Sequence, residues 1–275
     1  IYRSHWAIIV GMFVNGMLRL IFSYSFYANP FRKFKVVKTY FPEFIAFAKI
    51  VLPTSIITIF IAQGDKLVLA KLLTMGQLGI YYIAFNMSSA IQGLISSLPY
   101  KVFYPIYSEV VRDRPHSLHE EFYKSKTKIL WALCFAIGIA SGSANLIFEI
   151  LYDDRYIQGG LFFSLLLIHS ALCTITYPAE SCLIATGITK VVLINNLLRL
   201  AWIAVGVPFS VSTGNNVIVL IVFSTIEILP IFYMLRELHK KDILNLTFEI
   251  VNVVCFTIGF LVTFYIITHL YPFSL

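Results

Sequence analysis

Residues 129–148 read ILWALCFAIGIASGSANLIF, twenty positions without a single Asp, Glu, Lys or Arg. A helix that crosses a bilayer needs about 20 mostly apolar residues, because each residue adds about 1.5 Å towards a hydrocarbon core about 30 Å thick. The stretches 156–179, 200–226 and 250–275 also lack these charges, and Pro208 and a polar STGNN segment divide the second of them between two helices. Helices satisfy all their own backbone amides in lipid, so the sequence predicts an all-α polytopic membrane protein.

The composition agrees with this class. Hydrophobic residues make up 59% of the chain and charged residues 13%, whereas soluble domains have roughly 45–50% and about 25%. The net charge of +7 lies mostly in loops, so it indicates orientation in the membrane rather than nucleic-acid binding. All four cysteines fall within predicted spans, and no CxxC pair or His/Cys cluster is present, so we expect neither disulfides nor a metal site. These cysteines are Cys134, Cys173, Cys182 and Cys255.

We predict about eight transmembrane helices, and the basic residues between them give their orientation. Thirteen Lys and Arg residues fall in the loops on one side of the membrane and four on the other. The positive-inside rule places the richer side in the cytoplasm of a multi-pass cytoplasmic (inner or plasma) membrane. The predicted spans are 6–26, 44–64, 77–104, 129–149, 157–185, 190–211, 216–235 and 250–270.

With this orientation the first helix runs inward and both ends of the chain lie outside. The chain begins with Ile1 and shows no signal peptide, so we expect a fragment whose upstream helices are missing. The segment 28–43 mixes basic and aromatic residues between two spans. It either lies along the inner membrane surface with its aromatic rings in the headgroups or is an ordinary basic loop.

Ionisable residues inside spans are costly and usually face a partner or an aqueous cavity. Arg199 has Asn195 and Asn196 one turn before it on the same helix face. Glu180 follows Pro178, and Glu227 precedes Pro230, so both carboxylates lie near breaks in a helix. The other such residues are Arg19, Lys49, Asp65, Lys66 and Lys101.

Each of these residues also has a purely structural interpretation. Lys101 and Lys66 would extend to the membrane interface, and Arg199 and Glu227 would pair with one another between helices. Asp65 and Lys66 would form a helix end as readily as a gate.

Four motifs resemble one family when taken in order. They are similar to motifs of the polysaccharide flippases, and they read GDKLVLA at 64–70, GQLGIYYIA at 76–84, KVFYPIYSE at 101–109 and PAESCLIATG at 178–187. The basic linker NPFRKF at 29–34 is similar to the connection between the two lobes of these proteins. The chain thus resembles Wzx-like exporters of lipid-linked oligosaccharides in the multidrug/oligosaccharidyl-lipid/polysaccharide superfamily.

The resemblance implies two six-helix lobes, arranged as an inverted V and related by a pseudo-two-fold axis. Residues 1–43 would be the last helix of the N-terminal lobe with its basic linker, and 44–235 the C-terminal lobe. Residues 236–275 would add a cytoplasmic loop and an extra helix. The expected partners are a lipid-linked saccharide, membrane lipids and the missing N-terminal lobe, with no nucleic acid.

The resemblance further implies a flippase that moves an undecaprenyl-diphosphate-linked repeat unit by alternating access, with no cofactor beyond possible coupling to H⁺ or Na⁺. We expect no enzyme activity, because the sequence has no phosphate-binding loop, GxSxG or HExxH motif. The alternatives are a multidrug or toxin cation antiporter of the same superfamily and a membrane polysaccharide polymerase. The hypothetical roles are substrate binding by Arg199, Lys101, Arg19, Asn195 and Asn196, ion coupling by Glu180 and Glu227, and a gate at Asp65 and Lys66.

Overall fold

The computed structural model describes residues 5–26 and 40–270, and the regular elements of this part are helices. The chain forms two compact units, Ile1–Lys49 and Ile50–Leu275. The first contains α1 (His5–Phe26) and the first turns of α2 (Phe41–Leu72). The second continues α2 and contains the remaining helices: α3 (Met75–Leu98), α4 (Tyr104–Asp113), α5 (Leu118–Gly142), α6 (Ala144–Leu151), α7 (Gln158–Ala185), α8 (Val191–Ser212), α9 (Asn216–Ser224), α10 (Ile228–Lys240) and α11 (Leu246–Leu270).

Six helical stretches of the described residues are long and apolar enough to cross a membrane, or up to seven if the bent pair α5–α6 is one span. The sequence predicted about eight spans, and six or seven of them are found in the part of the chain that the structure describes. The predicted span 44–64 lies within α2, which is not among the six or seven.

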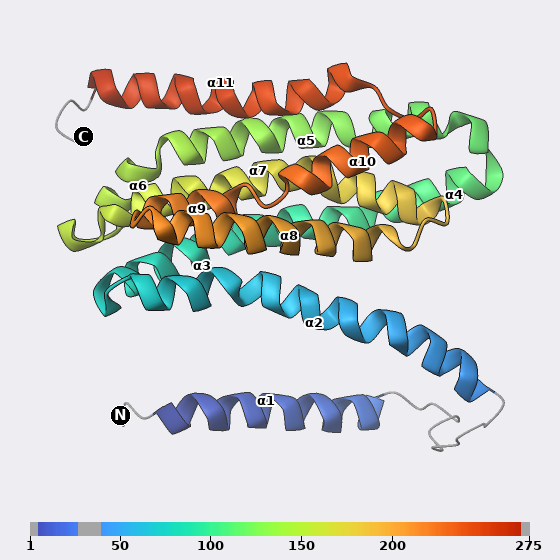
Figure 1. Cartoon of the computed structure of the whole chain (residues 1–275), viewed down its shortest axis with the longest axis horizontal. Helices are drawn as coiled ribbons and strands as arrows, with labels where there is room; N and C mark the ends of the chain where they lie inside the picture. The colour runs from blue at the N-terminus through green and yellow to red at the C-terminus, as the bar shows by residue number, and fades with distance from the viewer. Residues whose placement is uncertain (1–4, 27–39, 271–275) are drawn as a thin grey trace. The chain divides into compact units, whose positions relative to one another are not determined.

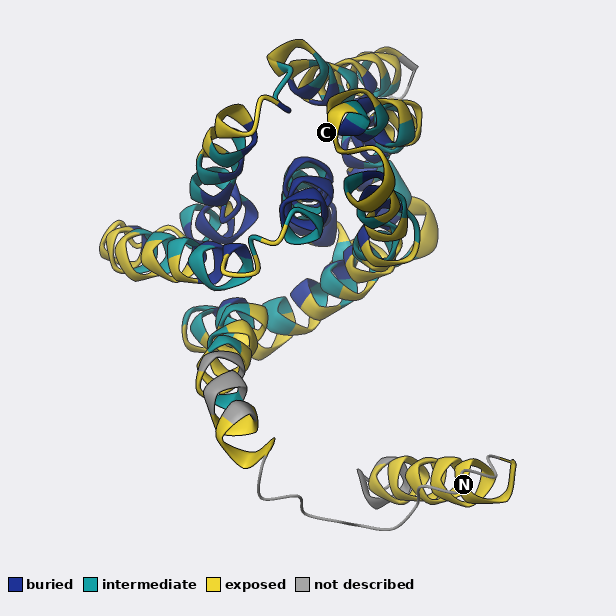
Figure 2. Ribbon diagram, turned by 90° about the vertical axis from the view of Figure 1, so that its right-hand side faces the viewer, coloured by how far each residue is buried: buried dark blue, intermediate teal, exposed yellow. Residues whose placement is uncertain are grey.

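In the second unit, α7 is the central helix, and it contacts α3, α4, α5, α6, α8, α9, α10 and α11. Its buried residues cover most of its circumference, as expected of a helix that is apolar on all sides. Buried residues gather on the inner helices of the unit, which Figure 1 labels and Figure 2 colours by burial, and many large apolar residues are exposed. An apolar outer surface, with the polar side chains of the spans buried inside, suits a bundle surrounded by lipid.

Three of the predicted spans are interrupted rather than straight. A π-helical turn, Pro99–Phe103, joins α3 to α4, and such turns often occur where a helix serves a functional site. The α5–α6 pair bends by 61°. The predicted span 216–235 is divided into α9 and α10, and Glu227 lies in the break between them.

The C-terminal helix α11 packs closely against α5. A Cβ atom added at Gly138 would overlap the backbone of Phe256, and one added at Gly259 would overlap the carbonyl oxygen of Phe135. Small residues of this kind let two membrane helices approach backbone to backbone. The contact also contains a buried ion pair between Lys126 of α5 and Glu249 of α11.

Lys126 was expected in a cytoplasmic loop, but it lies within α5 and is 1% exposed. The helix begins at Leu118 because its first turns pack Phe122 and Tyr123 into the core. Glu249 meets the buried ammonium group, and Tyr123 also donates a hydrogen bond of 3.2 Å to this carboxylate. A single-sequence charge count cannot separate such a buried lysine from the solvated lysines of a loop.

The close α5–α11 contact predicts that Gly138→Ala destabilises the protein. The added methyl group has no space at the Phe256 carbonyl, and overpacking of this kind costs roughly 1–3 kcal/mol. Gly79→Ala is the matched control, since Gly79 is also helical and has nothing within 4 Å of an added Cβ. Thermal unfolding of the two purified variants checks this prediction, and equal midpoints would contradict the close contact.

The predicted orientation can be tested at two exposed connections, His116 between α4 and α5 and Thr213 between α8 and α9. We expect a membrane-impermeant maleimide to label Thr213→Cys in intact cells. His116→Cys should react only after the membrane is opened, because its loop carries the basic residues. The parent protein is the control, since three of its four cysteines are buried and Cys255 is partly buried. The reverse labelling pattern would invert the topology.

Candidate functional site

A cavity of about 320 Å³ lies inside the second unit. Its walls come from α2, α3, α7 and α8, from the end of α9, and from the break between α9 and α10. The side chains around it include seven that are charged or ionisable or carry amides: Asp65, Gln92, His169, Tyr177, Asn196, Arg199 and Glu227. Polar groups are expensive within a membrane bundle, so a cavity lined by them marks a candidate functional site.

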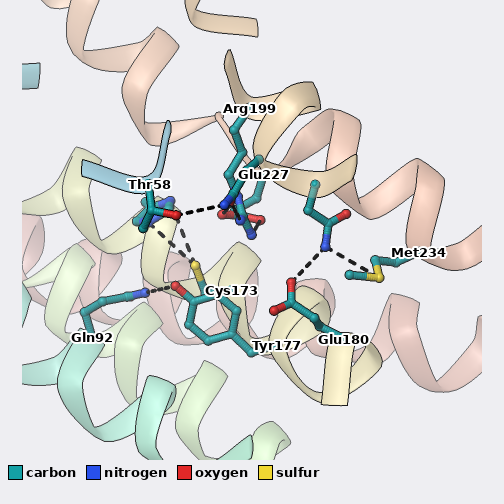
Figure 3. A network of polar contacts seen from close by, with 11 residues as sticks. Thr58, Gln92, Cys173, Tyr177, Glu180, Arg199, Glu227 and Met234 are labelled. Atoms are coloured by element: carbon teal, nitrogen blue, oxygen red, sulfur yellow. Dashed lines mark hydrogen bonds and ion pairs between the residues drawn. The ribbon is translucent and has the colours of Figure 1, made fainter. Parts of the chain in front are cut away.

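The strongest interaction at the cavity is a two-pronged ion pair between Arg199 of α8 and Glu227. The Nε atom of Arg199 donates to Oε1 of Glu227 over 2.8 Å, and Nη2 donates to Oε2 over 3.0 Å (Figure 3). The arginine is 9% exposed and the glutamate 2%. Paired N–H···O bonds between a guanidinium and a carboxylate are strong and fix the orientation of both groups.

The pair extends through a chain of amide and hydroxyl groups to α2. Arg199 Nη1 donates to Oδ1 of Asn196 over 2.9 Å, and Asn196 Nδ2 donates to the Thr58 hydroxyl over 2.8 Å. Thr58 in turn donates to the carbonyl oxygen of Thr54 over 2.8 Å. The i, i+3 spacing of Asn196 and Arg199 places both on one face of α8, as the sequence predicted.

A second polar cluster lies beside the first. Asn195 Nδ2 donates to Oε2 of Glu180 over 2.8 Å and contacts Sδ of Met234 over 3.9 Å (Figure 3). The amide oxygen of Asn195, Oδ1, is buried without a hydrogen-bond partner, and so is the hydroxyl oxygen of Thr176. Glu180 is 8% exposed, so this cluster is a buried polar group rather than an open surface.

The α3 and α7 walls meet at a third polar contact, in which Gln92 Nε2 donates to the Tyr177 hydroxyl over 3.0 Å. One turn of helix before Tyr177 on α7, the thiol of Cys173 lies 3.6 Å from Nε2 of His169. The ligand-type atoms of His169, Cys173 and Glu227 all lie within 4.8 Å of one another. This group has the donors of a metal site, but both Glu227 oxygens accept from Arg199, whose positive charge opposes a second cation there.

Asp65 and Lys66, expected as a gate or a helix end, lie inside α2 and make different contacts. The Tyr81 hydroxyl of α3 donates to Oδ2 of Asp65, which is 7% exposed. Lys66 instead donates to Oε1 of Gln63 over 2.8 Å, and its ammonium group lies 3.9 Å from the centre of the Phe85 ring. Asp65 therefore faces the cavity, and the adjacent Lys66 is not paired with it.

The structure brings six of the nine predicted site residues into one region of the second unit, and Lys66 and Lys101 of the same unit do not line the cavity. Arg199, Asn196, Glu227 and Asp65 line the cavity, and Asn195 and Glu180 form the adjacent cluster. Lys101 is exposed on the π-helical turn. Arg19 is exposed on α1, in the other unit, where its Nε donates to Asn15 over 3.1 Å.

Sequence reasoning missed several residues of the cavity. Thr58 and Ser88 are hydroxyl residues in apolar helices, and Gln92, Tyr81 and Tyr177 are polar residues among many aromatics. None has a charge, and of the five only Tyr81, which contacts Asp65 rather than lining the cavity, lies within a motif. The only sequence signal is a neutral polar side chain within a predicted span.

The family model described as "Polysaccharide biosynthesis protein" matches residues 1–159 of the chain. The match begins before α1 and ends at the start of α7, so it includes the cavity residues that come from α2 and α3, among them Asp65. No curated protein and no solved structure matches the chain.

The Arg199–Glu227 pair predicts a non-additive effect of mutation. Arg199→Gln or Glu227→Gln alone leaves one buried charge without its partner and should cost about 3–5 kcal/mol of stability. The double variant removes both charges and should lose clearly less than the two single losses together. Thermal unfolding in detergent measures this, with Arg112→Gln as the control.

The control breaks the pair of Arg112 with Asp113, in which both side chains are largely exposed. Exposed pairs contribute about 0–1 kcal/mol, so this variant should unfold close to the parent protein. Strictly additive losses at Arg199 and Glu227 would show that the two groups do not depend on one another.

Proposed function

Because the chain belongs to the polysaccharide biosynthesis protein family, we propose that it moves a lipid-linked saccharide across the cytoplasmic membrane by alternating access. The observation that carries the proposal is the polar cavity inside a bundle of membrane-spanning helices. In the proposal, residues 1–43 are the last helix and linker of an N-terminal lobe, 44–235 are the C-terminal lobe and 236–275 add one helix. An undecaprenyl diphosphate is the proposed carrier.

The lining of the cavity suits a saccharide. Sugar hydroxyl groups both donate and accept hydrogen bonds, and the cavity offers amide, hydroxyl and phenol groups from Gln92, Asn196, Ser88 and Tyr177. Aromatic and aliphatic side chains such as Phe85 complete the wall. A largely apolar pocket with a few placed polar groups is the usual form of a small-molecule site.

Arg199 is the proposed contact for the diphosphate, although it is held by Glu227 in this conformation. An incoming diphosphate would have to replace Glu227 as the partner of the guanidinium group. Protonation of Glu227 would weaken the pair and make this exchange easier. Ion binding and substrate binding would then be coupled through one side chain, with Glu180 and Asn195 as the neighbouring polar cluster.

The remaining charged candidates have lesser roles in this proposal. Lys101, exposed on the π-helical turn, would attract the anionic carrier at the membrane interface, and Arg19 would do so from α1. The bundle would bend during alternating access at Pro178, which lies within the continuous helix α7, and at the break between α9 and α10. The proposed activity is transport and not an enzymatic reaction.

A multidrug or toxin cation antiporter is the second candidate function. It is favoured by one observation, the buried carboxylate of Asp65 that faces the cavity without a basic partner among the described residues. A membrane polysaccharide polymerase has no comparable support in the cavity.

The test is complementation of a strain that lacks its oligosaccharide flippase by the full-length protein. We expect the wild type to restore surface polysaccharide. Arg199→Ala at equal protein level should lower it strongly, whereas Lys128→Ala, with no role in the cavity, should not. Unchanged polysaccharide with Arg199→Ala would remove this residue from the mechanism. Failure of the wild type, together with gained resistance to organic cations, would favour the antiporter.

A further inference from the structure

Asp65 is a buried carboxylate with an unused acceptor. Its Oδ2 atom accepts a hydrogen bond from Tyr81, while Oδ1 is buried and has no partner. The residue is 7% exposed and lines the cavity. Among the described residues no basic side chain forms an ion pair with it, since Lys66 contacts Gln63 and Phe85. A buried charge without a partner is costly, so this oxygen is available for a positively charged ligand.

The charges of the cavity divide between its two ends. Thr58, which connects to the Arg199–Glu227 pair, lies seven residues before Asp65 on α2, and seven residues of helix rise about 10 Å. At the first end the positive charge of Arg199 and the negative charge of Glu227 cancel. At the other end the charge of Asp65 is not cancelled by a paired cation. The cavity therefore favours a ligand whose positive charge reaches the Asp65 end.

The walls around this end indicate which kind of cation it would take. A metal ion such as Na⁺ or Ca²⁺ requires several oxygen ligands. Of the two carboxylates that line the cavity in the described part of the chain, Glu227 is held by Arg199 at the first end, so Asp65 stands alone at this one, where Phe85 and Phe223 provide aromatic walls. A protonated amine needs fewer oxygens, because it donates three hydrogen bonds and is also attracted to aromatic faces. The hydroxyls of Ser88 and Ser89 donate their hydrogens to backbone carbonyls. Their oxygen atoms can therefore accept hydrogen bonds from an amine.

We propose that Asp65 binds a protonated amine, and that the saccharide moved by this protein carries a free, non-acetylated amino group. The amine would donate to Oδ1 of Asp65 while the rest of the sugar extends towards Asn196 and Arg199. The assignment to a saccharide rests on the proposed transport function. The binding of an amine at Asp65 does not.

The experiment measures ligand binding to the purified full-length protein in nanodiscs by calorimetry. Glucosamine hydrochloride and N-acetylglucosamine differ at one nitrogen, which is a protonated amine in the first and a neutral acetamide in the second. We expect glucosamine to bind at least about tenfold more tightly, and Asp65→Asn to remove this preference. Glu109→Gln, a change at an exposed carboxylate of α4, should keep it. Tyr81→Phe removes a donor but leaves the carboxylate, so it should also keep the preference.

Two further ligands distinguish the source of the amine. Benzylamine carries the same charged group without a sugar, and tighter Asp65-dependent binding of benzylamine than of glucosamine would identify a free organic amine as the ligand. Sodium chloride that displaces glucosamine competitively in the parent protein would overturn the proposal, because the site would then take inorganic ions. Equal binding of glucosamine and N-acetylglucosamine would overturn it as well. These binding results are independent of complementation, so either proposal can fail alone.

Discussion

A charged side chain within a bilayer must find a partner, and this requirement determines how the helices of the second unit meet. Arg199 on α8 is held by Glu227 at the α9–α10 break, and Lys126 on α5 is held by Glu249 on α11. The Lys126–Glu249 pair joins helices that are distant in the sequence, and the Arg199–Glu227 pair joins α8 to the end of the helix that follows it. Because a lone charge would face lipid or an apolar core, helix arrangements that separate these partners are strongly disfavoured. The pairs therefore select one packing among the many that apolar helices permit.

The two buried pairs differ in what surrounds them, and this difference separates a structural pair from a functional one. The Lys126–Glu249 pair lies beside the rings of Phe122 and Tyr123. It joins α5 and α11, whose backbones come into close contact through glycines further along the two helices. It is not part of the cavity wall. The Arg199–Glu227 pair lines the cavity and occurs where a helix is interrupted. A carboxylate at a helix break can move at lower cost than one within an intact helix, because fewer backbone hydrogen bonds must change.

The sequence predicted the helices well where a span is uninterrupted. The predicted span 157–185 is α7 at 158–185, and 190–211 is α8 at 191–212, because a long apolar run without charges has one stable form in lipid. The breaks were less predictable: the π-helical turn and the 61° bend depend on packing between distant helices. At the site, Arg199, Asn196 and Glu227 were recognisable because ionisable and amide groups are rare within spans. Thr58 and Tyr81 were not, since their role depends on contacts from other helices.

The pairing of Arg199 bears directly on which ligands can engage it. Removing one partner from a buried ion pair costs about 3–5 kcal/mol, so a ligand that takes the guanidinium group from Glu227 must offset a loss of this size. A neutral sugar hydroxyl contributes only about 0.5–1.5 kcal/mol per hydrogen bond and cannot displace the carboxylate alone. A diphosphate can, because it offers several charged oxygens in the geometry that the guanidinium group prefers. In the proposed mechanism the ion pair thus acts as a selectivity element, because an anionic carrier can take Arg199 from Glu227 and a neutral solute cannot.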